Sequence, residues 1–387
     1  MSEWKTYRLG DICSRIKSGK GIPASKVSPT GKYPVIGGNG IRGYTDTSNF
    51  KGDCAVVGRQ GAYCGNVRFF TGEAYMTEHA VVIVGNELAD TKYLAYLLSI
   101  MQLGHLSAQS AQPGLSVQTL SKLSIDIPDL STQQQIAAIL GALDDKIELN
   151  RRINANLEEQ AQALFKSWFV DFEPFRDSPF VDSELGKIPQ GWKEGDYTDI
   201  VEIRGGGTPK TDMQEYWNGN IPFFSPKDVG AGCFILDTEK HITAKGLENC
   251  NSSLFQPNTV FITARGTVGK VVMSGTEMAM NQTNYALLGK QNIPQYYVYH
   301  ITLQLVGRLL KKANGAVFNA ITTRDFACEQ IVIPPYSTIK HFSDIVKPIY
   351  ENILLNEIQS NRLSALRDTL LPKLMSGEIS VEKGFTD

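Results

Sequence analysis

An internal repeat constrains this chain more than any other feature of its sequence. Residues of the first half recur in the second half at a constant shift of 206 positions. The pairs that carry this register are Arg59 and Arg265, Thr77 and Thr283, Ala80 and Ala286, Ile127 and Ile333, Asn150 and Asn356, and Leu157 and Leu363. The shift shortens to 186 at Gly21 and Gly207 and to 188 at Trp4 and Trp192, so we expect about 18 to 20 additional residues in copy two, within 230–258. Since chance matches do not keep one register over so long a span, the sequence predicts two copies of one structural unit.

The first part of each copy has the pattern of a mixed α/β domain. In copy one, aliphatic runs at 54–57 and 80–84 alternate with glycine-rich turns. A helical pattern follows near Lys92–Leu103, and a last strand is expected at Leu123–Ile127.

The second part of each copy predicts a long helix with a narrow apolar stripe. The stripe alternates spacings of four and three residues, which is typical of a coiled-coil seam. Its members are Ile136, Leu140, Leu143, Ile147, Leu157, Ala161, Leu164 and Trp168 in copy one, and Phe342, Val346, Ile349, Ile353, Leu363, Leu370 and Leu374 in copy two. We expect Ser131 and Gln134 to form a capping box at the start of the first helix and Pro174 to stop it.

Helix length suggests a role for this pair. A helix of about 37 residues is about 55 Å long, which exceeds one turn of B-DNA, about 34–36 Å. Two such helices packed together would hold two globular parts at a fixed distance. A dimerisation or bundle helix without a measuring role is the alternative.

The middle of the seam is polar. It passes through Asn150 and Asn154 in copy one and through Asn356 and Ser360 in copy two. If the helices run antiparallel about a pseudo-two-fold axis, Asn154 lies opposite Asn356 and Asn150 lies opposite Ser360. A slipped register would leave an amide facing a leucine, so these pairs would fix the register. Alternatively, the seam opens here to solvent or to a partner.

Composition excludes several classes of protein. Of the 387 residues, 42% are hydrophobic and 20% charged, as in an ordinary globular protein. No signal-like segment and no apolar run of ~18 residues is present, so we expect a cytoplasmic protein. The six cysteines form no CxxC pair, and no metal site is expected.

Charge predicts weak nucleic-acid binding by the chain alone. The net charge is −2, and residues 131–190 carry 6 basic against 10 acidic side chains. DNA affinity depends largely on phosphate neutralisation, so a DNA-binding chain of this charge would need a basic partner.

Four segments of the chain resemble a known family. The segment 131–136, STQQQI, and the segment 162–174, QALFKSWFVDFEP, resemble the central region of type I restriction-modification specificity subunits. The segment 185–192, LGKIPQGW, looks like the opening of that family's second target-recognition domain. The segment 367–379 is similar to its closing helix. The resemblance covers essentially the whole chain.

The resemblance implies an α+β architecture of two globular α/β target-recognition domains in a pseudo-two-fold repeat, separated by two long helices that form an antiparallel coiled coil. The corresponding boundaries are 1–130 and 192–335 for the two domains, 131–174 and 336–378 for the spacer helices, 175–191 for a linker and 379–387 for a tail. Each domain would read one half of a bipartite, gapped DNA site. Two methyltransferase subunits that use S-adenosylmethionine and motor-nuclease subunits that use ATP and Mg²⁺ would be partners, and the chain itself would hold no cofactor and no catalytic residue.

Several strings imitate catalytic motifs. The segment 38–43 fits GxGxxG, but no helix is expected after it, whereas a dinucleotide site needs a helix amino terminus at the pyrophosphate. Ile333-Pro334-Pro335-Tyr336 resembles the target-base motif of amino-methyltransferases but lacks its Asn or Asp. These absences disfavour the main alternative, a self-contained DNA methyltransferase or restriction enzyme with fused recognition domains. A pure scaffold is a weaker possibility.

Glycine-rich loops are the predicted DNA-reading elements. Glycine lets the backbone approach phosphates or base edges, and Arg or Gln can grip guanine or adenine bidentately. A tight turn with a surface side chain is the alternative at each position. The candidates are Gly38, Asn39, Gly40, Arg42, Tyr44, Arg59, Gln60, Ser110 and Gln112 in copy one, and Lys227, Arg265, Thr267, Gln282 and Asn284 in copy two.

Overall fold

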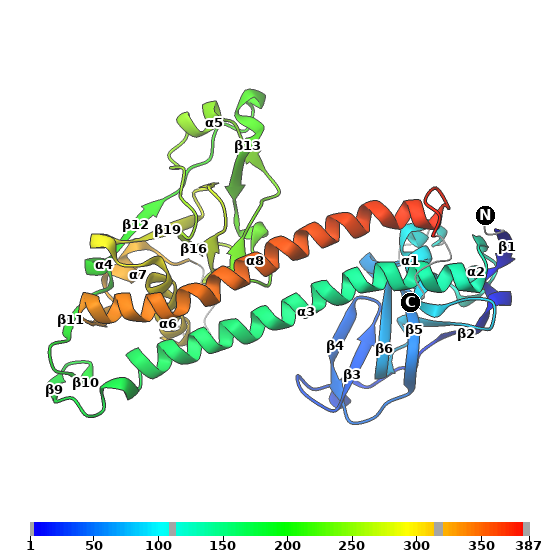
Figure 1. The fold of residues 1–387 in the computed structure, drawn as a ribbon, viewed down its shortest axis with the longest axis horizontal. Coiled ribbons are helices and arrows are strands. Elements are labelled where there is room, and N and C mark those ends of the chain that lie inside the picture. Colours follow the sequence, from blue (N-terminus) through cyan, green and yellow to red (C-terminus); the bar gives the residue numbers. More distant parts are fainter. Residues whose placement is uncertain (1–3, 108–113, 313–319, 382–387) are drawn as a thin grey trace. The chain divides into compact units, whose positions relative to one another are not determined.

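The chain forms two compact units that both include part of each long helix (Figure 1). The computed structural model describes residues 4–107, 114–312 and 320–381. The first unit consists of Met1–Ile147 and Arg362–Asp387, and the second of Glu148–Asn361. The two helices are α3, Leu130–Phe169, and α8, Tyr336–Met375. This mixture of helix and sheet, with two long helices, confirms the fold class that the sequence predicts.

A six-stranded sheet forms the centre of the first unit, in the order β2-β7-β5-β6-β3-β4. Its strands are β2 Cys13–Ser18, β3 Tyr33–Gly37, β4 Gly40–Thr45, β5 Phe50–Gly58, β6 Val67–Met76 and β7 Ala80–Gly85. A separate antiparallel pair joins β1, Lys5–Arg8, to β8, Ser124–Ile127. The expected last strand, Leu123–Ile127, is thus present as β8.

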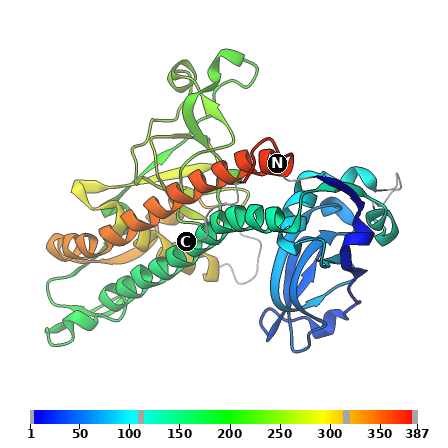
Figure 2. The ribbon, with the colours of Figure 1, turned by 45° about the vertical axis from the view of Figure 1, so that its right-hand side comes forward.

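Helices cover one face of this sheet and close its core. Helix α1, Thr91–Ile100, buries Leu94 and Leu98 against strand residues of the same cluster, and α2, Val117–Ser121, precedes β8. Both long helices contribute, since Leu140 of α3 and Leu374 of α8 belong to this core. Figure 2 shows the start of α3 reaching the strands of this unit.

The second unit repeats this plan with a divided sheet. Its sheets have the orders β12-β19-β16-β17-β14 and β15-β13-β18, and β11 pairs with β20 as β1 does with β8. The strands are β11 Lys193–Asp196, β12 Val201–Gly205, β13 Trp217–Phe224, β14 Phe234–Ile235, β15 His241–Ile242, β16 Val260–Thr263, β17 Val271–Ser274, β18 Ala279–Met280, β19 Asn284–Gly289 and β20 Gln330–Ile333. The helices are α4 Tyr197–Ile200, α5 Ala244–Glu248, α6 Gln295–Lys312 and α7 Thr323–Ala327, and a hairpin of β9, Phe180–Ser183, and β10, Gly186–Pro189, precedes them.

The additional residues of copy two lie where the sequence places them. Between β13 and β16 the second unit has β14, β15 and α5, whereas the first unit has only β4 between β3 and β5. This segment supplies an extra strand to the main sheet, because β14 pairs in parallel with β17.

Helix α3 differs from its predicted bounds at both ends. It ends at Phe169 instead of Pro174, because the chain turns at Phe172, which has a positive φ of 54°. The capping residue is Asp129, whose carboxylate accepts hydrogen bonds from the Thr132 amide at 3.1 Å and hydroxyl at 2.9 Å. The predicted capping box of Ser131 and Gln134 is therefore wrong. Helix α8 begins at Tyr336 as expected and ends before Gly377, whose φ of +75° suits the position after a helix.

Within each unit α3 and α8 run antiparallel. In the second unit Phe165 contacts Phe342, and nearer the middle of both helices Asn154 bonds to Asn356. In the first unit Arg367 bonds to Asp144. Lower numbers on one helix thus meet higher numbers on the other, as the sequence symmetry predicts.

Candidate nucleic-acid interface

In the first unit, three chain segments converge on the turn between β6 and β7. The Thr77 amide donates to Ile36 O at 2.9 Å, the Arg59 amide to His79 O at 2.9 Å, and the Lys20 amide to Met76 O at 2.9 Å. We call Lys20, Gly38–Arg42, Arg59–Gln60 and Glu78–His79 the first loop cluster.

Glycine is favoured where two of these segments meet. A Cβ on Gly38 would lie 3.1 Å from both Gly58 Cα and His79 O. The close approach that the glycine-rich string predicts is therefore between loops of the chain itself, and it leaves the neighbouring side chains on the surface.

The side chains of the first loop cluster differ in accessibility. Asn39, Arg42 and Gln60 are exposed, and Arg59 is partly buried. Tyr44 is also partly buried, and its backbone forms a two-way bridge with Ser28. The predicted contacts Ser110 and Gln112 lie outside the described residues.

The second unit builds the same arrangement around the turn Asn281–Thr283. The Asn281 amide donates to Phe224 O at 3.0 Å, the Ala264 amide to Thr283 O at 2.9 Å, and the Gly207 amide to Met280 O at 3.1 Å. We call Thr208, Ser225–Lys227, Arg265–Thr267 and Gln282 the second loop cluster. Three equivalent hydrogen bonds thus bring equivalent loops together in both units.

Of the candidates in copy two, four are exposed and one is not. Lys227, Arg265, Thr267 and Gln282 reach the surface, and the Gln282 side-chain oxygen accepts a hydrogen bond from Thr208 Oγ1. Asn284 is fully buried and donates to Asn281 Oδ1 at 2.8 Å and to Phe224 O at 3.4 Å. The prediction that Asn284 contacts DNA is therefore wrong, because its side chain braces the turn from inside.

The hydrogen bonds also correct the alignment of the two copies. Arg59 O accepts from Leu115 N at 2.9 Å and Ala264 O accepts from Ile321 N at 2.9 Å, so Ala264 occupies the place of Arg59. Gln60 then corresponds to Arg265, as their bridges to Gly114 and Ala320 also show. The pairing of Arg59 with Arg265 is wrong by one residue.

A second local error lies at β7 and β19. Ala80 pairs with Gly58 in one ladder and Asn284 with Thr263 in the other, so Ala80 corresponds to Asn284 instead of Ala286. A single shift of 206 residues does not align the two copies after a turn in which one copy has lost or gained residues.

The strongly perturbed titratable groups lie in the interior. Burial lowers the pKa of His300 to about 3 and raises the pKa of Cys13 to about 12. His300 Nε2 lies 2.9 Å from Tyr350 Oη in the core of the second unit. Within the described ranges no group of three or more His, Cys, Asp or Glu side chains could hold a metal ion.

Comparison with known proteins identifies the family. A model of the type I restriction modification DNA specificity domain matches residues 1–159 and again residues 189–365. The chain belongs to this family. The two matched ranges agree with the duplication that the sequence predicts.

Named type I specificity subunits are similar along most of their length. That of the restriction enzyme MjaIX from Methanocaldococcus jannaschii is 30% identical over 303 residues, which cover 76% of this chain and 70% of the relative. That of HindI from Haemophilus influenzae is 28% identical over 327 residues, which cover 69% and 71%. The crystal structure of a type I S subunit from M. genitalium has the same fold, with a TM-score of 0.62, 17% identity and 96% coverage of both chains.

No helix among the described residues of this type I specificity chain is long and apolar enough to cross a membrane.

The helix seam of this type I specificity chain places its polar residues in the expected pairs. Asn356 Nδ2 donates to Asn154 Oδ1 at 2.9 Å, and Asn150 Nδ2 lies 3.2 Å from Ser360 Oγ. Asn150 and Asn154 are buried. The alternative of a seam open to solvent does not hold at these two residues, while their role in fixing the register stays a prediction.

Sequence reasoning missed the turn at the centre of the first loop cluster and one segment of the second. Glu78 and His79 in the first unit and Thr208 in the second are surface residues of these clusters. A short polar turn between two apolar runs, at 77–79, was the available signal. This signal is weak, because the turn contains no glycine or arginine.

Proposed function

We propose that this chain is the DNA-specificity subunit of a type I restriction-modification complex and that it reads a bipartite, gapped site without catalysing a reaction. The family membership supports the general role. The proposal that the site is bipartite rests on the two loop clusters. Each is held by the same pattern of backbone hydrogen bonds, but the two carry different side chains. Each cluster would read one half of the site, since base identity is read by side chains on a positioned backbone.

The long helices would set the gap between the half-sites. A continuous helix of 40 residues is about 60 Å long, and each helix contributes to both units. Two methyltransferase subunits would supply S-adenosylmethionine chemistry, and motor-nuclease subunits would supply ATP- and Mg²⁺-dependent cleavage. The chain's net charge of −2 supports a requirement for basic partners in tight DNA binding.

A methyl-transfer assay separates this proposal from a self-contained methyltransferase. The purified chain is incubated with labelled S-adenosylmethionine and DNA of mixed sequence, alone and with the methyltransferase subunit of its own system. We expect incorporation only when the partner is present. Incorporation by the chain alone would overturn the proposal, and unselective methylation by the assembled complex would reduce the chain to a scaffold.

A further inference from the structure

The extra strand of the second unit closes one edge of its main sheet. β14 pairs in parallel with β17 through the Met273 amide, which donates to Cys233 O at 2.7 Å, and the Gly275 amide, which donates to Ile235 O at 2.7 Å. The Phe234 ring is buried and lies 6.3 Å from the Tyr350 ring of α8. This part of copy two's additional segment therefore fills the space between the sheet edge and the helix.

The first unit has the same sheet edge without that strand. In the first unit Ala55 of β5 pairs with Phe69 of β6, and in the second unit Val260 of β16 pairs with Met273 of β17. Phe69 therefore corresponds to Met273, and Thr71 corresponds to Gly275. The Gly58 amide donates to Asn66 O, so these two residues form a hydrogen-bonded pair. Because hydrogen-bonded and non-hydrogen-bonded pairs alternate along an antiparallel ladder, the amides of Phe69 and Thr71 point away from β5. Within the described part of the chain, the outer edge of β6 is paired only at Tyr75 and Met76, by β3.

An open groove of about 700 Å³ lies along this unpaired edge. Val67, Phe69 and Thr71 of β6 line it, with Tyr96 of α1 and Asp144 of α3. Asp144 stands 206 positions before Tyr350, the residue that contacts Phe234 in the second unit. Two independent correspondences, at Phe69 and at Asp144, therefore place the groove where β14 lies in the second unit.

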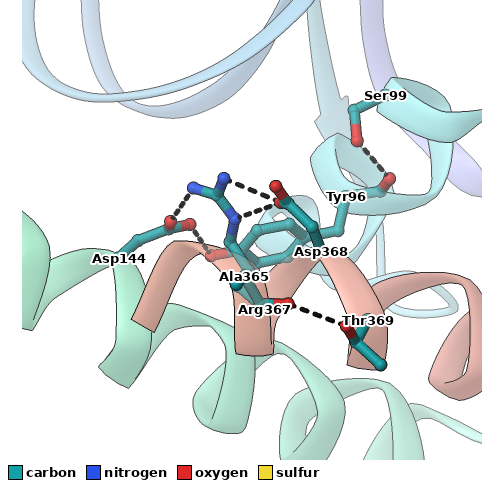
Figure 3. Close-up of polar contacts among 7 residues, drawn as sticks. All are labelled: Tyr96, Ser99, Asp144, Ala365, Arg367, Asp368 and Thr369. Atoms are coloured by element: carbon teal, nitrogen blue, oxygen red, sulfur yellow. Dashed lines mark hydrogen bonds and ion pairs between the residues drawn. The ribbon is translucent and has the colours of Figure 1, made fainter. Parts of the chain in front are cut away.

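The wall of the groove is a fixed polar network (Figure 3). Arg367 of α8 donates to Asp144 at 2.7 Å and to Asp368 at 2.8 Å, and Tyr96 Oη donates to Asp144 at 2.5 Å. In the second unit the places of Tyr96, Asp144 and Arg367 are taken by His300, Tyr350 and Ala161. At these three places the first unit thus carries an ion pair, whereas the second carries uncharged side chains.

The lining of the groove carries an excess of negative charge. Four carboxylates, Asp53, Asp144, Asp145 and Asp368, line it with two cations, Lys92 and Arg367. Arg367 is shared by two of the carboxylates, and Asp145 has a side chain that is 78% exposed, with Lys92 at 3.7 Å. An occupant with Lys or Arg beside an apolar side chain would match both the charge and the apolar floor.

We propose that this groove binds an extended segment of a partner protein, which adds to β6 as a parallel strand and places a basic residue beside Asp53 and Asp145. Main-chain hydrogen bonds to the amides of Phe69 and Thr71 give such added strands their affinity, and side-chain pockets give specificity. The inference concerns a surface other than the loop clusters and does not depend on how DNA is read.

The test uses a peptide copied from the strand that fills the equivalent place. The probe is a fluorescent peptide of residues 230–238 with Cys233→Ser and Asp237→Lys, and its anisotropy is measured while the full chain is added without DNA. We expect saturable binding, and hydrogen exchange of the amides in 67–73 that slows when the peptide is bound. No binding up to about 200 μM chain, or no change in exchange at 67–73, would overturn the proposal.

Two sets of variants locate the contact. Thr71→Pro removes an outward amide without removing a bond to β5, and it should weaken binding by about threefold or more, whereas Thr71→Val keeps the amide and the affinity. Asp53→Asn with Asp145→Asn should weaken binding of this peptide but not of the peptide that keeps Asp237. Equal peptide affinity of all variants would contradict the proposal. A dimer of the chain that dissociates on Thr71→Pro would also contradict it, since the edge of β6 would then bind a second copy of the chain.

Discussion

Gln60 and Arg265 occupy the same place in the two loop clusters, as their bridges to Gly114 and Ala320 show. Both side chains are exposed. Arginine suits the acceptor pair of guanine and glutamine suits the donor and acceptor of adenine, so one position of the frame could read different bases in the two half-sites.

Replacing Arg265 should weaken recognition of one half-site only. We expect Arg265→Ala to weaken the apparent free energy of DNA binding by the assembled complex by roughly 1–3 kcal/mol, because a bidentate base contact is lost. Methylation of the cognate site should fall accordingly. Methylation of the cognate site at limiting enzyme and moderate salt measures the effect. Lys290→Ala, at the opposite end of β19 from the cluster, removes the same charge and should act like the unmodified chain. Equal methylation by both variants would make Arg265 a turn residue.

A partly buried carboxyl group gives the second unit a pH-dependent stability. Desolvation, followed by the nearby Glu158 carboxylate, raises the pKa of Glu357 to about 7. The folded state therefore holds a proton that the unfolded state has already released, and this contribution is present at low pH and lost as pH rises through about 7.

Glu357→Gln should therefore raise the melting temperature at pH 8 and change it little at pH 5. Thermal unfolding at both pH values measures this, with Glu351→Gln as the control, since Glu351 is exposed and lies 3.7 Å from Lys347. A Glu357→Gln variant that melts lower than the unmodified chain at pH 8 would show that the charged form is the favoured one.

The residues that sequence reasoning misplaced share a physical cause. Asn284 and Gln282 are neighbours in sequence, but Asn284 begins β19 and turns inward, whereas Gln282 lies in the exposed turn. Residue type alone does not distinguish them, because the choice depends on where the turn ends.

At the scale of elements, the polar centre of the seam is the feature with the most direct consequence. Asn150 Nδ2 lies within hydrogen-bond distance of Asn356 O, Gln359 Oε1 and Ser360 Oγ. Asn154 Nδ2 donates to Ile353 O at 3.2 Å. A shift of one helix by a turn would break these bonds and bury unpaired amides, which costs about 1–3 kcal/mol for each.

Replacing Asn150, Asn154, Asn356 and Ser360 with leucine should stabilise the helix pair and loosen discrimination over gap length. Apolar pairs are stable in several registers, whereas the amide bonds favour one. Thermal unfolding and methylation of sites with gaps altered by one base pair measure the two effects. A variant that melts lower and keeps strict gap discrimination would contradict this role.

Sequence predicted long elements better than short ones. The stripe from Ile136 to Trp168 predicts α3 because it repeats over many turns, and the apolar run at 80–84 falls within β7. The two-residue strand β14 has no such signal, since the Met273 and Gly275 amides hold it in place through tertiary contacts. The start of α3 was misjudged for a similar reason, because Asp129 and Ser131 are both good capping residues and only the backbone path decides between them.

At the scale of the whole molecule, the duplication is what the sequence revealed most reliably. The repeat implies two units of one plan, and the family model matches the chain twice. The shift of 206 residues between the copies holds along the two long helices. It is wrong by one or two residues at the loops, which are the parts that differ between the copies. A duplicated frame with independent loops predicts that each half of the DNA site can be changed separately.

Exchange of one recognition domain shows whether the two halves of the site are read independently. Residues 1–130 are replaced by those of another type I specificity subunit, and single-molecule sequencing identifies the methylated adenines in cells that also contain the partner subunits. We expect a new sequence in one half of the site, with the other half and the gap unchanged. A motif altered in both halves, or in the length of the gap, would contradict this expectation.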